Sequence, residues 1–281
     1  MQLVGPSEGL WLTGAFLFGL VFGSFGNVVI WRLPRGESLS HPGSHCPGCD
    51  TAIRWYDNVP ILSWVLLGGR CRTCGMPISV RYPLVELLSG VLWLAAAWRF
   101  GMTWAGGAAI VFFYILQLLA FIDWDVMRLP NPLVLILLGV GVVGVIASQV
   151  FGVVAVPLFS SGPGIWSVPL VSATAGALVT SALTLAISLA YKLIRGGKGY
   201  GMGDVKLIAV IGVFLGLYSL MTMFFATLVG AVYGLLAART SEEGGRLKIP
   251  FGPFIAAAAV LVTLFGPQLW AWYTGLGRTI L

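Results

Sequence analysis

Long apolar runs dominate this chain and constrain its fold more than any other feature. A helix needs roughly 20 apolar residues to cross a hydrocarbon core of about 30 Å. With 58% hydrophobic and 9% charged residues and a mean hydropathy of +0.94, the chain is too apolar for a soluble domain. We predict an all-α polytopic integral membrane protein with about eight transmembrane helices. The predicted spans are 10–30, 84–100, 103–121, 133–151, 168–194, 205–217, 222–238 and 254–270.

The first run is predicted to be a retained helix. No basic residue precedes it and no small-x-small cleavage site follows it, so it does not have the pattern of a cleaved signal peptide. The sixth run is the shortest and needs its flanking residues to cross a bilayer.

Basic residues predict how the helices are oriented. Of the 16 Lys and Arg residues, all except Arg99 and Arg278 lie in or beside the loops that follow the first, third, fifth and seventh runs. Because Lys and Arg accumulate on the cytoplasmic side, these loops are predicted to be cytoplasmic and both termini to lie outside the cytoplasm. Membrane orientation thus explains the net charge of +6, and no nucleic-acid partner is predicted.

The polar segment between the first and second runs contains every cysteine of the chain. Two CxxC pairs separated by 21 residues have the spacing of zinc ribbons. Disulfides are the alternative, but they are rare in the reducing cytoplasm. We therefore predict a small cytoplasmic zinc-ribbon-like loop whose zinc is structural, because four thiolates leave no open position for a reactive water. The predicted ligands are Cys46, Cys49, Cys71 and Cys74.

Four of the ten acids are predicted to lie at the cytoplasmic ends of spans. Glu86 begins the second span, Asp123 and Asp125 end the third, and Asp204 begins the sixth. An ionisable group at membrane depth is costly and is therefore a candidate functional residue. The two glycines of the sequence GMGD, Gly201 and Gly203, allow a sharp turn and close approach of a substrate before Asp204.

Asp123 and Asp204 come from different helices at the same depth and can face one another. Two carboxyl groups within a few ångströms cannot both ionise easily, so the pair shares a proton. One acid then acts as a base toward water while the other, protonated, polarises a carbonyl, which is aspartyl peptide hydrolysis. Alternatively, Asp204 only caps a helix. Asp125 must face a different side of the helix from Asp123 and is expected to be solvated or to support the site indirectly.

Two other classes of membrane protein also use acids carried by transmembrane helices. An ion-coupled transporter would place Asp123 and Asp204 on a cation path, but it is expected to have acids nearer the bilayer middle and internal repeats, which the sequence lacks. A magnesium-dependent membrane transferase would gather Asp123, Asp125 and Asp204 around the ion. Sensitivity to a chelator separates this second enzyme from a protease. His41 and His45 lie beside the cysteines and are expected to be zinc neighbours or solvated, not a catalytic base.

Six motifs follow one another along the chain: GSFGNVVIWRLPRG at 23–36, the paired CxxC loop, RYPLVELLSG at 81–90, FIDWDVMRLPN at 121–131, GMGDVKL at 201–207 and IPFGPFIA at 249–256. Together they resemble bacterial prepilin peptidases, the type IV leader peptidase family of GxGD membrane aspartyl proteases. The family commonly has a bulky apolar residue where this chain has Gly26. The resemblance implies that Asp123 and Asp204 are the catalytic pair.

The resemblance also implies a reaction and a place in the cell. The reaction is cleavage of the short basic leader of a type IV prepilin or pseudopilin, after a glycine, at the cytoplasmic face of the bacterial inner membrane, with no cofactor for proteolysis. Similar family members also methylate the new N-terminus with S-adenosylmethionine. The implied organisation is a first transmembrane helix (1–31), a cytoplasmic tetracysteine loop associated with N-methyl transfer (32–83) and a transmembrane aspartyl peptidase domain (84–281).

Three polar residues near the predicted site keep two interpretations each. Glu86 either contacts the positive charge of the leader or a transferred amine, or it caps the second helix. Lys206 is expected to reach lipid phosphate, with substrate contact as the alternative. Asn27 either bonds across helices or lines a methylation site. The sequence PFGPF at 250–254 marks the start of a helix.

Overall fold

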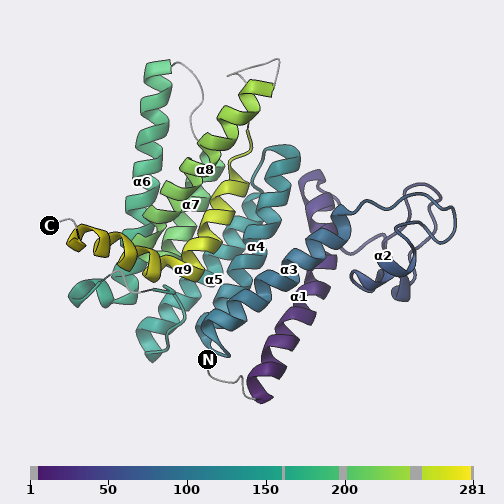
Figure 1. Cartoon of the computed structure of the whole chain (residues 1–281), viewed down its shortest axis with the longest axis horizontal. Coiled ribbons are helices and arrows are strands. Elements are labelled where there is room, and N and C mark those ends of the chain that lie inside the picture. The colour runs from purple at the N-terminus through teal and green to yellow at the C-terminus, as the bar shows by residue number, and fades with distance from the viewer. Residues whose placement is uncertain (1–5, 160–161, 196–200, 241–248, 280–281) are drawn as a thin grey trace. The chain divides into compact units, whose positions relative to one another are not determined.

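Helices joined by turns make up the fold (Figure 1). The computed structural model describes residues 6–159, 162–195, 201–240 and 249–279, and no strand occurs among them. The all-α prediction is therefore confirmed for these residues. They divide into two compact units, Met1–Met102 and Thr103–Leu281.

Two long helices and a folded loop form the first unit. Helix α1 (Pro6–Arg32) packs along α3 (Arg81–Phe100). The loop between them contains the short helices η1 (Leu33–Arg35), η2 (Trp55–Asn58) and α2 (Leu62–Leu66). The predicted span at 84–100, which the resemblance groups with the peptidase domain, lies in this unit.

Glycines allow α1 and α3 to approach closely. A Cβ atom on Gly19 would lie 2.8 Å from the Cα of Gly90, and one on Gly23 would lie 2.7 Å from the Cα of Glu86. Small residues at such positions let helix backbones meet and gain van der Waals contact within a membrane. The motifs around positions 23 and 90 therefore include the packing surface of this helix pair.

Six α-helices form the second unit over the part of it that the structure describes. They are α4 (Trp104–Val126), α5 (Asn131–Phe151), α6 (Pro169–Arg195), α7 (Met202–Leu215), α8 (Ser219–Thr240) and α9 (Gly252–Thr279). The 3₁₀ helix η3 (Gly164–Ser167) precedes α6, and η4 (Gly216–Tyr218) joins α7 to α8. Helix α4 contributes much of the core, and its Phe112 stacks on Phe214 of α7 with ring centroids 4.5 Å apart.

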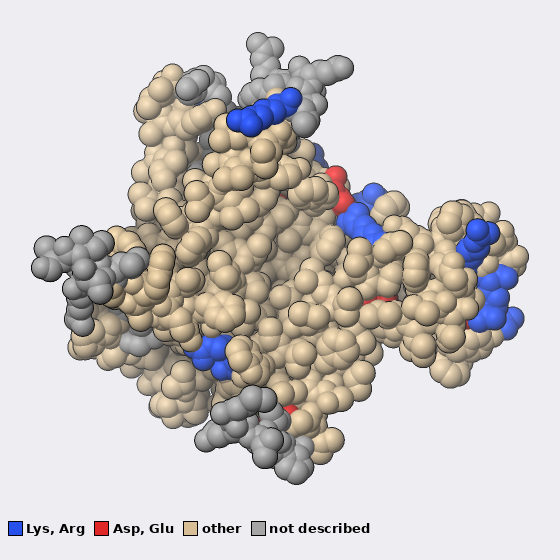
Figure 2. Space-filling view, in the orientation of Figure 1, with Lys and Arg blue, Asp and Glu red and all other residues tan. Residues whose placement is uncertain are grey.

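All eight predicted spans are present as helices, but the sixth is short. Helix α7 has 14 residues and rises about 21 Å, less than the hydrocarbon thickness of about 30 Å. With η4 and α8 it forms one apolar segment, Met202–Arg239, so the described residues contain seven segments long and apolar enough to cross a membrane. The others are Glu8–Arg35, Arg81–Phe100, Trp104–Val126, Asn131–Phe151, Pro169–Ile194 and Gly252–Gly275. Charged side chains are correspondingly sparse on the face drawn in Figure 2.

Candidate active site

Asp123 is placed by the last turn of α4. The residue is only 5% exposed, and its backbone carbonyl accepts a hydrogen bond of 2.8 Å from the amide of Met127. Met127 adopts a left-handed conformation (φ 51°) that ends the helix, and Pro130 and Pro132 follow. The turn therefore fixes the backbone of Asp123 beside the loop to α5.

Asp204 lies in the first turn of α7 and has two roles. Its Oδ2 accepts a hydrogen bond of 3.0 Å from the amide of Gly201, so it satisfies a free amide at the helix start. It also lines the same two cavities as Asp123. Asp204 therefore caps α7 and is also part of the candidate site.

Two cavities meet at this pair of acids. Asp123, Asp204, Met127 and Gly201 line both of them. One cavity, of about 390 Å³, is mainly apolar and is further lined by Ile187, Ser188, Tyr191, Ile249, Pro250 and Phe251. The other, of about 380 Å³, is more polar and is further lined by Arg128, Leu129, Asn131, Met202, Gly203 and Lys206. A chain lying across the acids would thus meet apolar side chains in one cavity and cationic ones in the other.

The remaining residues predicted for this site fall in different places. Gly203 packs on Leu129, where an added Cβ would lie 3.2 Å from the Leu129 Cβ. Lys206 lines the polar cavity, and its Nζ donates to Asn131 Oδ1 over 3.2 Å. Asp125 is exposed and lines neither cavity.

Gly252 contacts Asp123 although the sequence assigned it no chemical role. Its amide donates to Asp123 Oδ2 over 2.8 Å, a buried contact between residues 129 positions apart. The prediction that PFGPF begins a helix is confirmed, because Gly252 is the first residue of α9. A glycine between two nearby prolines was the available signal, and it indicated the start of a helix without indicating which side chain Gly252 would approach.

The four cysteines of the first unit lie on two similar turns. An antiparallel bridge between His45 and Ala52 closes the first knuckle, residues 45–52, and one between Arg70 and Pro77 closes the second knuckle, residues 70–77. Zinc ribbons use paired turns of this kind to present two thiolates each.

The two knuckles repeat one hydrogen-bonding pattern. The amide of Asp50 donates to the Cys46 carbonyl over 2.8 Å, and the amide of Gly75 donates to the Cys71 carbonyl over 2.9 Å. Asp50 (φ 55°) and Gly75 (φ 72°) stand at the same position in each turn, and both adopt the left-handed conformation that aspartate and glycine tolerate.

The sulfur atoms have the spacing of a tetrahedral metal site. All four lie within 4.8 Å of one another, with 3.8 Å between Cys46 and Cys74 and 4.0 Å between Cys49 and Cys71. A tetrahedron with Zn–S bonds of about 2.3 Å has sulfur atoms roughly 3.8 Å apart. No disulfide joins these cysteines. Backbone amides of Cys74 and Thr73 lower the pKa of Cys71 to about 6, which favours the thiolate that binds metal.

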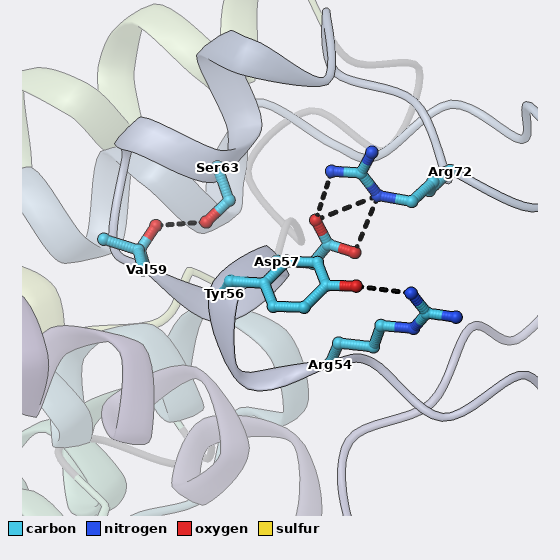
Figure 3. Close-up of polar contacts among 6 residues, drawn as sticks. All are labelled: Arg54, Tyr56, Asp57, Val59, Ser63 and Arg72. Carbon is cyan, nitrogen blue, oxygen red and sulfur yellow. Dashed lines mark hydrogen bonds and ion pairs between the residues drawn. The ribbon is translucent and has the colours of Figure 1, made fainter.

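An ion pair ties the second knuckle to η2. Arg72 donates to Asp57 through Nη2 (2.6 Å to Oδ1) and Nε (2.9 Å to Oδ2), and Figure 3 shows the two groups facing each other. These bonds lower the pKa of the Asp57 carboxyl. In the same view Arg54 donates to the hydroxyl of Tyr56. The loop is thus fixed by polar contacts beyond its cysteines.

Glu86 links three parts of the first unit. The residue is 8% exposed on α3, and its Oε2 accepts a hydrogen bond of 2.7 Å from the amide of Ile61 in the loop. Ser24 of α1 bonds to the same carboxyl group. Ile61 has φ 60°, which is unusual for a β-branched residue. Asn27 also bonds between helices, to the Tyr82 carbonyl over 3.2 Å.

Comparison with known proteins identifies the family of the chain. The family model described as "Bacterial Peptidase A24 N-terminal domain" matches residues 17–100, and that of the type IV leader peptidase family matches residues 110–235. A protein of Stutzerimonas stutzeri named prepilin leader peptidase/N-methyltransferase is 35% identical over 288 residues, 94% of each chain. The chain belongs to the type IV leader peptidase family. Proteins of that name are also 36% identical in Aeromonas hydrophila and 35% identical in Pseudomonas aeruginosa, covering 97% and 90% of each chain.

The two family models match the cysteine-containing loop and the helices that carry the two acids. The match at residues 17–100 includes the four cysteines and Glu86, and the match at residues 110–235 includes Asp123 and Asp204. No solved structure matches the chain.

Proposed function

We propose that this chain is a membrane aspartyl endopeptidase that removes the leader of type IV prepilins or pseudopilins after a glycine, and then methylates the new N-terminus. The observation that carries the first activity is the meeting of Asp123 and Asp204 at two adjoining cavities. The names of the family relatives support both activities.

In the proposed cleavage, the two acids divide the proton chemistry between them. The ionised acid takes a proton from a water molecule as that water attacks the scissile carbonyl carbon. The protonated acid donates to the carbonyl oxygen, and a proton then passes to the departing amine as the C–N bond breaks. The cationic side chains at the polar cavity and the apolar walls of the other would hold the peptide across the pair.

Proposed assignments for other residues follow from their contacts. Gly201 and Gly203 shape the backbone that brings Asp204 to the pair, and Lys206 is a substrate-side residue of the polar cavity. Asp125 remains outside the reacting groups. Glu86 holds the loop to α1 and α3.

The proposed cofactors are a structural zinc ion and S-adenosylmethionine. The sulfur spacing and the four-thiolate set fit zinc, which Cys46, Cys49, Cys71 and Cys74 would hold to fold the loop at 32–83. S-adenosylmethionine would supply the methyl group, in keeping with the N-methyltransferase name of the relatives.

The chain has the apolar segments of a multi-pass membrane protein, and its relatives are bacterial. We propose that it lies in the inner membrane with the acids at the cytoplasmic face and both termini on the other side, as the basic residues favour. The basic leader of a prepilin and its apolar helix would then place the scissile bond at the depth of the acids.

Cleavage of a purified prepilin by wild type and by Asp123→Asn, Asp204→Asn and Asp125→Asn tests the peptidase. We expect the first two variants to lose at least about 100-fold in kcat, because each removes a proton-transfer group. Asp125→Asn should stay within about threefold of wild type, as an exposed substitution. Normal cleavage by the variants at 123 and 204 would refute the assignment of Asp123 and Asp204 as the catalytic pair.

Each reaction is repeated with excess EDTA to separate the two candidate enzyme mechanisms. A pair of acids sharing a proton continues to cleave, whereas loss of cleavage by the wild type in EDTA, restored by magnesium, would favour the metal-dependent transferase arrangement.

A further inference from the structure

The segment at 249–252, which leads into α9, contacts Asp123 and α8. It lies outside residues 110–235, the part of the chain that matches the leader peptidase family model. Ile249, Pro250 and Phe251 nevertheless line the apolar cavity beside Asp123 and Asp204.

Two glycines on one face of α8 hold this segment in place. A Cβ atom on Gly230 would lie 2.7 Å from Cε2 of Phe251, and one on Gly234 would lie 3.0 Å from Cδ1 of Ile249. Residues four apart lie on the same side of a helix, so the two glycines form one shallow surface for the Ile249 and Phe251 side chains. The path of the segment is therefore set by α8 immediately before Gly252.

Gly252 then approaches Asp123 more closely than any other residue type could. A Cβ atom at this position would lie 2.8 Å from Oδ2, 3.1 Å from Cγ and 3.0 Å from Cβ of Asp123. The Asp123 carboxyl could rotate away from the new atom, but its Cβ is fixed to the backbone of α4. The backbone of Gly252 has no positive φ, so alanine is excluded here by this contact and not by conformation.

We infer that Gly252 is a positioning residue of the peptidase: its amide fixes the orientation of the Asp123 carboxyl group in the cavities that Asp123 shares with Asp204. The inference rests on the proposed function and deepens it. A carboxyl group bonded at Oδ2 by the amide keeps its other oxygen available for water or substrate. Asp204 receives a comparable bond from Gly201, so each acid is held by a backbone donor that needs no side chain.

Leader cleavage by Gly252→Ala, with Gly275→Ala as its matched control on the same helix, tests this role. A Cβ on Gly275 would meet no atom within 4 Å. We expect Gly252→Ala to lower kcat about 100-fold, because displacing a reacting group by roughly 1 Å can cost this much, and to change KM less than about threefold. Gly275→Ala should resemble the wild type. A fall in kcat of less than tenfold, or a loss confined to KM, would overturn the inference.

If Gly252→Ala folds poorly, a stability measurement distinguishes an effect through Asp123 from a general effect on α9. The melting temperature in detergent is measured for wild type, Gly252→Ala, Asp123→Gly and the double variant. If the alanine acts through the Asp123 side chain, it lowers the melting temperature in the wild type but not in Asp123→Gly, where the atoms it would meet are absent. An equal decrease in both backgrounds would show a general effect on α9 and would overturn the inference.

The two experiments also separate this inference from the proposed function. If the wild type cleaves no prepilin, the peptidase assignment fails, yet the coupling of positions 252 and 123 in stability remains measurable. If the wild type cleaves and Gly252→Ala cleaves equally well, the peptidase assignment stands and the positioning role fails.

Discussion

The amide of Gly201 donates to the carboxylate of Asp204 over 3.0 Å, three residues ahead on the same helix start. Gly252 does the same for Asp123 from a distant part of the chain. Both candidate catalytic groups are thus oriented by amides at the starts of helices, α7 and α9, where free N–H groups are available. The orientation of each carboxyl group therefore depends on the position of a backbone amide.

Gly203→Ala should weaken cleavage by moving the first turn of α7. Its Cβ would lie 3.2 Å from the Cβ of Leu129, so either Leu129 or the turn that bears Asp204 must shift by a few tenths of an ångström. We expect kcat to fall roughly tenfold, a smaller loss than for a displacement of about 1 Å. Kinetics of leader cleavage provide the measurement, with Gly107→Ala as control because a Cβ there meets no atom within 4 Å. Equal kcat for both variants would contradict the expectation.

Removing one cysteine should release the metal and open the loop. We expect about one zinc ion per wild-type chain and none in Cys74→Ser, because three thiolates hold a structural ion poorly. Structural zinc contributes about 10–16 kcal/mol in small metal-folded domains, so trypsin should then cut after Arg54 and Arg70 much faster than in wild type. Elemental analysis and limited proteolysis test this. Zinc-free wild-type protein with an intact, resistant loop would count against a metal-folded knuckle pair.

The ion pair of Asp57 with Arg72 gives the loop a dependence on pH. Hydrogen bonds and charge from Arg72 lower the pKa of Asp57 in the folded loop. The pair therefore stabilises the loop fully above the ordinary aspartate pKa of about 3.9, and the contribution disappears as the pH falls through the folded value. NMR titration of the Asp57 carboxyl carbon should give a higher midpoint in Arg72→Met than in wild type. An unchanged midpoint would mean that the pair does not persist in solution.

Gly23→Ala should destabilise the first unit. The new Cβ would lie 2.7 Å from the Cα of Glu86, a backbone atom that cannot turn aside. Overpacking of this kind costs about 1–3 kcal/mol, so the melting temperature of the purified protein should decrease. Gly14→Ala on the same helix has open space at its Cβ and should melt like the wild type. Identical melting of the two variants would show that α1 and α3 tolerate a wider separation.

Sequence reasoning was most successful where a local pattern carries the physical signal. Apolar run length predicted the helices, and CxxC spacing predicted that four sulfur atoms would converge. The sequence placed Asp123 and Asp204 at the same end of their spans, and both line the same two cavities. Each of these three predictions depends on residues close together in the sequence or on depth in the membrane. Both kinds of information can be read from a single sequence.

Contacts between distant segments could not be predicted in this way. Nothing in the sequence around Gly252 indicates a bond to a residue 129 positions earlier. Lys206 was expected to reach lipid phosphate, with substrate contact as the alternative, and neither interpretation included the bond of its Nζ to Asn131 on α5. Glu86 was expected at the start of a helix, whereas its bond to the amide of Ile61 depends on the path of the whole loop. Such partners are set by tertiary packing.

The bond between Gly252 and Asp123 also bears on how this protein is made. A chain emerging from the ribosome inserts its N-terminal helices first. Both acids are therefore synthesised before the segment that carries Gly252. A nascent chain that has reached only α8 contains the two carboxyl groups but lacks the amide that orients one of them. The orientation of the candidate catalytic pair is thus completed by α9, so this pair cannot become competent before that helix has been synthesised.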